Sequence, residues 1–276
     1  MAKVLIHDIS YWQGNLSTYW QMFRERGCKG VICQSTNGLA YQSYYRDTAP
    51  LIRKEGFLLG SYHYYREHIQ NMEGTWVVCN PTRQADNYYN WVTKVGVPNE
   101  FPPVLDIEFG GNPMGVTYNN INACLKHMEK LFGRTPIIYT SPNVARSFAR
   151  AGLERYPLWL AHYTTEDKVT VPAPWTRWTI WQYSDKLTYD KVNSNGVVTS
   201  RKPIDHNWFN GNLGELKKWI VQTGGTLPST TPAPTPEPEP EPTPTPEPEP
   251  TPQPVIDISA LKTRLNSAID DWAKTL

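Results

Sequence analysis

Runs rich in β-branched and aromatic residues alternate with helical patterns along most of this chain of 276 residues. The strands predicted from these runs are Lys3–Ile9, Gly30–Ser35, Leu58–Tyr64, Pro103–Glu108, Pro136–Thr140, Leu158–His162, Trp178–Tyr183 and Pro203–His206. The predicted helices are Ser17–Arg26, Tyr44–Lys54, Thr82–Val95, Tyr118–Phe132, Pro142–Ala151 and Gly214–Gln222. Because strands that alternate with helices form a parallel sheet covered by those helices, the order predicts an α/β fold, a (β/α) barrel of about eight strands.

The last third of this barrel is expected to be irregular. The segments between the sixth, seventh and eighth predicted strands have no helical pattern, and they contain Pro172, Pro174 and the turn sequence Asn193-Ser194-Asn195-Gly196. Such residues favour turns over helices. We therefore expect fewer helices there, with antiparallel or hairpin pieces in their place.

The composition changes sharply after residue 225. Thirteen of the 25 prolines lie between Pro228 and Pro254, where Pro, Thr and Glu repeat. Alternating prolines fix φ and remove backbone donors. The sequence therefore predicts a barrel over residues 1–225 followed by an extended linker over residues 226–254.

Residues 255–276 carry a single amphipathic pattern. Apolar residues recur at spacings of three and four: Ile258, Leu261, Leu265, Ala268 and Trp272. The pattern predicts one helix whose apolar face needs a partner. We expect first that this helix self-associates and makes the protein a homo-oligomer. Docking on a partner or wall component, or being the start of a longer domain, are the alternatives.

Charge and hydropathy narrow the class of partner. The first 227 residues hold 24 basic and 18 acidic residues, a net charge of +6, whereas the whole chain has a net charge of +1. A basic body suits a polyanionic surface such as a cell wall, and ordinary variation in surface charge explains it equally well. The chain has no Arg/Lys-rich run with interleaved aromatics and no apolar run of about 18 residues, so we expect neither nucleic-acid binding nor membrane insertion.

The cysteines and the N-terminus carry a prediction about processing and redox state. Cys28, Cys33, Cys79 and Cys124 lack the spacing of metal ligands and are predicted to be buried thiols, with disulfides as the alternative. Met1 is followed almost directly by the first predicted strand, so we expect no signal peptide.

The fourth predicted strand ends in two carboxylates, Asp106 and Glu108. Residues at i and i+2 of a strand point to the same side, so both face the barrel interior or mouth while Ile107 faces the helices. Barrel enzymes place catalytic groups at this end of their strands. Burial and mutual repulsion keep a proton on one of two close carboxyl groups near neutral pH, which is the division of labour that glycosidic bond cleavage requires. A structural pairing with Arg or Lys is the alternative.

Two further acids are expected to join this pair. Asp8 ends the first strand and Asp205 lies in the eighth, and these two strands are neighbours in a closed barrel. Four uncompensated carboxylates at one mouth destabilise a fold, so the cluster indicates function. Aromatic and polar residues at the strand ends predict a groove that binds substrate. These residues are Tyr62, Tyr64, Tyr139, Trp159, Tyr163 and Gln182.

Seven short motifs in order resemble those of glycoside hydrolase family 25, the Chalaropsis-type lysozymes common among phage endolysins. The similarity covers about residues 3–215. The motifs are Asp8-Ile9-Ser10 with Trp12-Gln13-Gly14, Gly60-Ser61-Tyr62-His63-Tyr64, Val104-Leu105-Asp106-Ile107-Glu108, Ile138-Tyr139-Thr140, Leu158-Trp159-Leu160-Ala161, Trp181-Gln182-Tyr183, and Ile204-Asp205-His206-Asn207 with Phe209-Asn210-Gly211. The resemblance implies an irregular barrel and an N-acetylmuramidase. Such an enzyme cuts the β-1,4 bond between N-acetylmuramic acid and N-acetylglucosamine of bacterial peptidoglycan, without a metal or other cofactor.

The resemblance also implies roles for individual residues. Glu108 would be the general acid. Asp106 would orient or charge-stabilise the N-acetyl group that attacks C1, or act on water. Asp8 and Asp205 would tune these two acids, and Tyr62 and Tyr139 would steady the acetamido group. The choice between a substrate-assisted and an inverting route depends on the separation of the carboxyl groups.

The second strand departs from the family pattern. It carries Gln34 and Asn37 where the family usually has a basic residue and a Glu, which affects subsite contacts near the first strand. The histidines are expected to have packing or rim positions, and His63 points away from its neighbour Tyr62.

Two other functions compete with the lysozyme. A chitinase-like hydrolase has a longer run of alternating aspartates, and here Val104 stands two residues before Asp106. A non-catalytic glycan-binding module would lack one of the acids, and none is missing. For a lysozyme without a signal peptide, the expected setting is phage lysis, in which the enzyme waits in the host cytoplasm and then reaches the cell wall.

Overall fold

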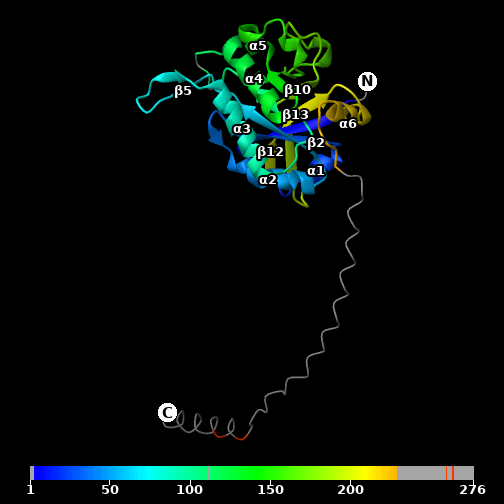
Figure 1. Cartoon of the computed structure of the whole chain (residues 1–276). Helices are drawn as coiled ribbons and strands as arrows, with labels where there is room; N and C mark the ends of the chain where they lie inside the picture. Colours follow the sequence, from blue (N-terminus) through cyan, green and yellow to red (C-terminus); the bar gives the residue numbers. More distant parts are fainter. Residues whose placement is uncertain (1–2, 111, 113, 229–258, 260–262, 264–276) are drawn as a thin grey trace. The chain divides into compact units, whose positions relative to one another are not determined.

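Eight strands close into a barrel in the structure, a computed structural model that describes residues 3–110, 112, 114–228, 259 and 263 (Figure 1). In spatial order, β1 pairs with β2 on one side, and the sheet runs through β4, β7, β8, β9, β10 and β13 back to β1. The bounds are β1 (Val4–Ile9), β2 (Gly30–Asn37), β4 (Leu58–Tyr64), β7 (Val104–Asp106), β8 (Ile137–Thr140), β9 (Leu158–Ala161), β10 (Ile180–Ser184) and β13 (Asp205–Phe209). The barrel predicted from the sequence is confirmed.

The chain divides into two units, Met1–Pro228 and Ser229–Leu276, and the barrel belongs to the first. Almost all of the predicted linker and C-terminal helix, residues 226–254 and 255–276, lies outside the described residues.

Six α-helices accompany the strands in the described unit. They are α1 (Trp20–Glu25), α2 (Ser43–Lys54), α3 (Pro81–Val95), α4 (Tyr118–Phe132), α5 (Pro142–Phe148) and α6 (Leu213–Gln222). Local chemistry sets several of their ends, because side chains of Asn80 and Ser141 cap α3 and α5 and left-handed glycines, Gly96 and Gly133, end α3 and α4. Within the described residues, none of the helices has the length and apolar character needed to cross a membrane.

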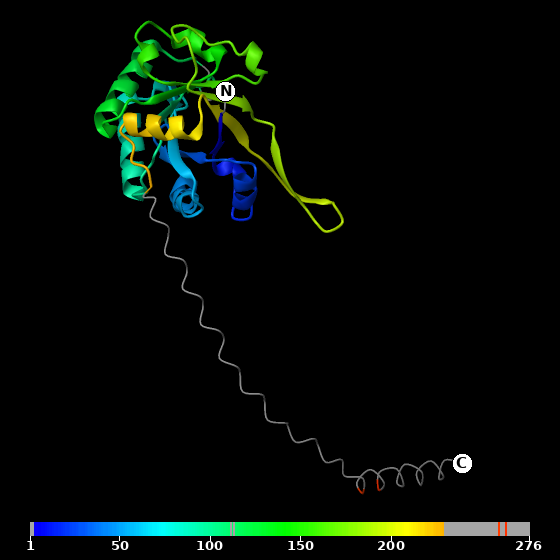
Figure 2. The same ribbon diagram turned by 90° about the vertical axis from the view of Figure 1, so that its right-hand side faces the viewer.

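The last third of the barrel contains a hairpin and an antiparallel strand, as the missing helical pattern indicated, whereas β10 is parallel to β9. β10 is followed by a hairpin of β11 (Thr188–Val192) and β12 (Val198–Pro203), which projects from the barrel (Figure 2). The chain then returns along β13, which is antiparallel to both of its neighbours, β1 and β10.

The bounds predicted for the eighth strand, Pro203–His206, were wrong. The barrel strand begins at Asp205 and continues to Phe209, and Pro203 belongs to β12. The sequence misleads here because polar Asn207 faces the barrel interior, where a strand pattern normally has an apolar residue. The short strands β3 (Ala40–Tyr41), β5 (His68–Gln70) and β6 (Trp76–Val78) were not predicted either.

The amino-terminal end of the barrel is closed by apolar side chains. Leu216 and Ile220 of α6 pack with interior residues of the strands, and the ring of Phe101 lies among them. Gly30 and Gly60 make room for this ring, since a Cβ at either position would stand 2.8 or 3.0 Å from atoms of Phe101. Polar groups inside the barrel are therefore confined to its opposite end.

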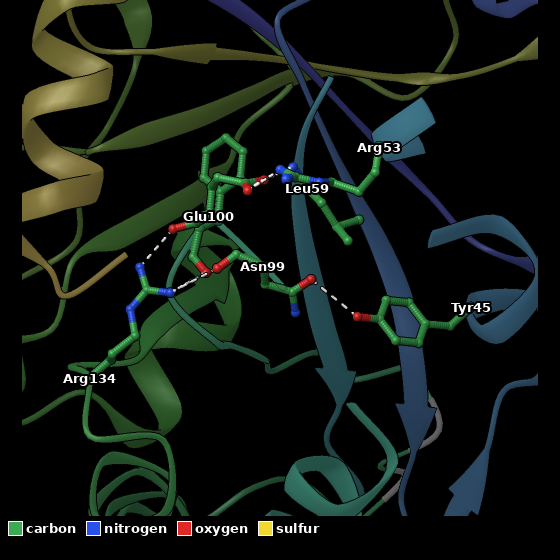
Figure 3. Close-up of polar contacts among 7 residues, drawn as sticks. Tyr45, Arg53, Leu59, Asn99, Glu100 and Arg134 are labelled. Carbon is green, nitrogen blue, oxygen red and sulfur yellow. Dashed lines mark hydrogen bonds and ion pairs between the residues drawn. The ribbon is translucent and has the colours of Figure 1, made fainter. Parts of the chain in front are cut away.

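A clamp of hydrogen bonds fixes the segment that carries Phe101 (Figure 3). The guanidinium of Arg134 donates to four carbonyl oxygens, at 2.7–3.2 Å, of Asn99, Glu100, Phe101 and Thr223. The carboxylate of Glu100 pairs with Arg53 and accepts from the backbone N–H of Leu59 at 2.7 Å. One arginine thus joins the end of α6 to the base of the barrel.

The four cysteines of the barrel are all buried and free, which confirms the predicted thiols. Burial raises the pKa of Cys28 to about 12 and that of Cys79 to about 11. These thiols therefore stay protonated at neutral pH and behave as small apolar side chains.

Arg134→Met should destabilise the barrel. The substitution keeps apolar volume but leaves up to four carbonyl groups without their donor, so we expect the free energy of unfolding to fall by about 2–4 kcal/mol in urea denaturation. Arg46→Met is the matched control, because Arg46 is exposed and, among the described residues, its guanidinium bonds only with the neighbouring Asp47. Equal urea midpoints for the two variants would contradict a stabilising role for the hydrogen bonds of Arg134.

Candidate active site

A pocket of about 410 Å³ opens at the carboxyl ends of the parallel strands. All ten residues predicted as catalytic or substrate-binding line it. They are Asp8, Tyr62, Tyr64, Asp106, Glu108, Tyr139, Trp159, Tyr163, Gln182 and Asp205. The residues come from seven of the eight barrel strands or from the loops that directly follow them. The barrel therefore brings together side chains that lie up to about 200 positions apart in the sequence.

Asp8 and Asp205 lie directly opposite each other in the β1–β13 register. Because β13 is antiparallel, its first residue lies at the same end of the barrel as the last residues of the parallel strands. Asp8 accepts hydrogen bonds from the side-chain amides of Gln182 at 3.0 Å and Asn207 at 2.7 Å. The predicted approach of the first and eighth strands is therefore confirmed.

The two aspartates differ in protonation. Burial raises the pKa of Asp8 to about 6, and the amide donors limit this rise. Burial and the adjacent charge of Asp8 raise the pKa of Asp205 to about 9. Near neutral pH, Asp205 therefore carries the proton and Asp8 is mostly ionised, so the pair holds about one negative charge.

Asp106 lies deeper than Glu108. Asp106 ends β7 and is only 6% exposed, and its Oδ1 is buried with no hydrogen-bond partner in the part of the chain that the structure describes. Burial, followed by the charges of Glu108 and Asp8, raises its pKa well above the usual value. An unpartnered buried acceptor is costly in a folded protein, so this atom is prepared for a donor that the chain itself does not supply.

Glu108 is less buried and lies two residues beyond Asp106. Its carboxylate accepts from the hydroxyl of Tyr64 at 3.2 Å. Burial raises the pKa of Glu108, while hydrogen bonds from Tyr64 and Tyr139 oppose part of that rise. The pocket therefore offers a carboxyl group able to hold and release a proton beside a deeper carboxyl group with a free acceptor.

A second hydrogen-bonded group comes from β8, β10 and the loop that follows β9. The side-chain oxygen of Gln182 accepts from the hydroxyls of Tyr139 and Tyr163, each at 2.8 Å. Trp159 is 1% exposed and its indole N–H donates to Asn207 at 2.7 Å. Trp159 therefore lies in the floor of the pocket, whereas Tyr163 is half exposed at its rim.

The sequence interpretation missed several lining residues. The 3₁₀ helix η1 (Tyr11–Gln13) carries Tyr11 and Trp12 at the rim, with 77% of Trp12 exposed. The signal was available, because η1 directly follows the strand that ends near Asp8. Arg66, two residues beyond β4, was also missed. Gln34 and Asn37 do line the pocket, as their expected effect on subsite contacts requires.

The histidines have structural positions. His63 is fully buried on the outer side of β4, where it bonds with Thr36 at 2.8 Å and Gln84 at 3.2 Å. His7 and His206 pack against each other on the outer faces of β1 and β13, with ring centroids 4.4 Å apart. Among the described residues, no group of three or more His, Cys, Asp or Glu is placed to hold a metal ion.

An α/β barrel whose mouth holds paired carboxyl groups, tyrosine hydroxyls and an exposed tryptophan is the arrangement of a glycoside hydrolase. The sequence model described as "Glycosyl hydrolases family 25" matches residues 7–192. The chain belongs to this family.

Known proteins support the assignment. The chain is 28% identical over 210 residues to N,O-diacetylmuramidase of Chalaropsis sp., a match that covers 70% of this chain and 88% of that protein. The crystal structure of a bacterial lysozyme from Streptomyces coelicolor is similar with a TM-score of 0.63 and 24% identity, covering 81% of this chain and 99% of the other. The crystal structure of the CTP1L endolysin is similar with a TM-score of 0.60 and 20% identity, covering 79% of this chain and 70% of the other.

Asp205→Asn should remove a pH-dependent cost of folding. The folded pKa of Asp205, about 9, exceeds its ordinary value of 3.8. Between these two pH values the folded protein retains a proton that the unfolded chain releases. The contribution of Asp205 to the free energy of unfolding is therefore fully present below about pH 4 and is lost as the pH rises towards about 9. Asparagine cannot ionise and keeps an N–H donor for Asp8. We expect the variant to melt about 2 °C or more above the wild type at pH 8.

Calorimetry between pH 5 and pH 9 tests this expectation. The difference in melting temperature should shrink steadily as the pH falls. A difference that stays constant over this range would contradict a raised pKa at Asp205.

Proposed function

We propose that the pocket hydrolyses the β-1,4 bond between N-acetylmuramic acid and N-acetylglucosamine in peptidoglycan. The observation that carries the proposal is the buried, unpartnered Oδ1 of Asp106 beside the more open Glu108. An N-acetylated sugar bound over this pair offers an amide N–H donor to that atom. The similarity to the N,O-diacetylmuramidase of Chalaropsis sp. supports muramic acid as the sugar.

Glu108 acts as the general acid in this proposal. Burial, the largest cause, raises the pKa of Glu108 above its usual value, which is the direction that a general acid requires. Tyr64, which donates to the same carboxyl group, fixes its orientation. Glu108 protonates the glycosidic oxygen as the bond from this oxygen to C1 breaks, and the sugar that leaves takes the proton with it.

Asp106 acts on the acetamido group. Its free oxygen accepts the amide N–H and turns the acetamido carbonyl oxygen towards C1, where that oxygen forms a new bond and a cyclic cation results. The amide N–H donor favours the ionised form of Asp106, whose negative charge then stabilises this cation. Water then attacks C1, returns a proton to Glu108 and reopens the ring, so that one water molecule is consumed per bond cut. Tyr62 and Tyr139, which line the same pocket, enclose the group.

Asp8 and Asp205 set the charge around these two residues. The charge of Asp8 helps to raise the pKa of Asp106. Since Asp205 is protonated near neutral pH, this pair adds about one negative charge instead of two. The pair thereby favours the positively charged transition state without excessive repulsion in the empty pocket.

The biological setting proposed is phage lysis, with the enzyme held in the host cytoplasm until it gains access to the wall. The similarity to an endolysin supports this setting. The net charge of +6 on the first 227 residues supports attraction to an anionic wall surface.

Glu108→Gln should abolish most lysis, because glutamine keeps the shape of the acid but has no proton to donate. We expect the clearing rate of purified cell walls to fall by about 10³-fold with unchanged melting behaviour. Glu166→Gln, at an exposed position outside the pocket, is the matched control. Near-normal clearing by the Glu108 variant would overturn the assignment of the acid.

Asp106→Asn should reduce the turnover number by at least about 10²-fold, since asparagine keeps an acceptor oxygen but cannot stabilise the cyclic cation by charge. The measurement is turnover on soluble glycan strands, with mass spectrometry of the products. Wild-type products should carry muramic acid at the reducing end. Glucosamine at that end would identify the other glycosidase specificity, and a mild effect of Asp106→Asn would leave this residue a structural role only.

A further inference from the structure

Arg66 is the only basic residue among the described residues that line the pocket. It lies two residues beyond Tyr64, so it continues the side of β4 on which Tyr62 and Tyr64 face the pocket. The carboxyl groups of Asp8, Asp106, Glu108 and Asp205 line the same pocket. A single guanidinium therefore faces a strongly acidic site.

Neutral groups hold this guanidinium. Its Nε donates to Oδ1 of Asn37 at 2.8 Å, and its carbon stands 4.9 Å from the centre of the Tyr64 ring. Its backbone is fixed as well, because its N–H donates to Oε1 of Gln84 at 2.9 Å and its carbonyl accepts from Nε2 of the same side chain at 2.7 Å. The cation is thus positioned without losing its charge to a carboxylate.

The terminal Nη groups of Arg66 have no hydrogen-bond partner in residues 3–110, 112 and 114–228, and Arg66 forms no ion pair there. Arginine presents its paired N–H groups as a fork that matches a carboxylate. In this pocket the fork remains available. Its positive charge also opposes the rise in the pKa of Asp106 and of Glu108, so it lies within electrostatic range of both.

We propose that Arg66 binds a carboxylate on the lactyl substituent of the muramic acid, and that this contact selects muramic acid over glucosamine. The inference rests on the proposed function. The two sugars differ by this substituent, which ends in a free carboxylate or continues into a peptide that bears carboxylates. An anion entering among four carboxyl groups is repelled unless a cation receives it, and Arg66 is the cation at hand.

Asn37 is the positioning residue for this contact. A carboxylate at position 37 would pair with Arg66 directly and occupy the fork, whereas the amide holds Nε and leaves the charge for a ligand. Asn37→Glu therefore provides a test that keeps Arg66 in place.

The experiment compares kcat/KM on three soluble glycan substrates. One has its peptides removed and carries free lactyl carboxylates, the second has these carboxylates converted to primary amides, and the third retains its peptides. The wild type should prefer the free carboxylate to the amide. Arg66→Gln and Asn37→Glu should each reduce this preference by about 10- to 100-fold, and Arg66→Lys should reduce it less.

The third substrate identifies the source of the carboxylate. If the variants lose kcat/KM only on the strands with free lactyl carboxylates, the contact is made by the lactyl group. If the variants lose kcat/KM only on the strands that retain peptides, and amidation of the peptide carboxylates abolishes this difference from the wild type, the contact is made by the peptide.

Equal losses on charged and amidated strands, with a shifted pH optimum, would overturn the inference, because Arg66 would then act on Asp106 and Glu108 instead of the substrate. If Arg66→Gln fails to fold, Asn37→Glu with unchanged preference would overturn it independently. A wild type that releases no fragments ending in muramic acid would instead overturn the proposed function, so the two failures are distinguishable.

Discussion

The antiparallel pairing of β13 with β1 is the constraint on which the rest of the site depends. It closes the barrel, and the register that closes it places Asp8 opposite Asp205. Two carboxyl groups in this position cannot both be ionised at low cost, so they share a proton. The fold thereby sets the charge near Asp106 and Glu108 before any substrate arrives. Backbone hydrogen bonds between two strands thus determine an electrostatic property of the pocket.

The second determinant is the division of the barrel interior into an apolar base and a polar mouth. Phe101 and the apolar face of α6 fill the base, so water does not reach the floor of the pocket from that side. Burial is accordingly the largest cause of the raised pKa of each of the four acids. Neutral donors such as Gln182 and Asn207 compensate part of this cost without neutralising the site.

Much of the fold follows from periodicity in the sequence. The bounds of β4 and α4 match the predicted ones, and α3 begins one residue earlier than predicted. In these elements, apolar residues recur at a regular spacing, and residues typical of helix or strand ends mark the termini. β13 lacks both, because Asn207 interrupts its inward pattern and Pro203 belongs to the preceding hairpin. Its direction depends on barrel closure, which local patterns do not encode.

The same distinction applies to the site. Asp8, Asp106, Glu108 and the tyrosines were predictable because each lies near the end of a recognisable parallel strand, whereas Asp205 lies at the start of β13. Arg66 was not, since an arginine in a loop normally faces solvent and nothing in its immediate sequence indicates the neutral partner Asn37, which lies 29 positions earlier. Its significance comes from a location in an acidic pocket without an ion pair among the described residues, which only three-dimensional contacts reveal.

The return path of β13 has a consequence for how this barrel can diversify. In a regular parallel barrel, each connection must travel the full height of the wall to start the next strand at the base. Here the connection from Ser184 to Asp205 starts and finishes at the mouth, so its length is free of that requirement. Closing a longer loop between fixed ends costs little additional entropy. Insertions between β11 and β12 could therefore reshape the surroundings of the pocket while the strand order and the apolar base stay unchanged.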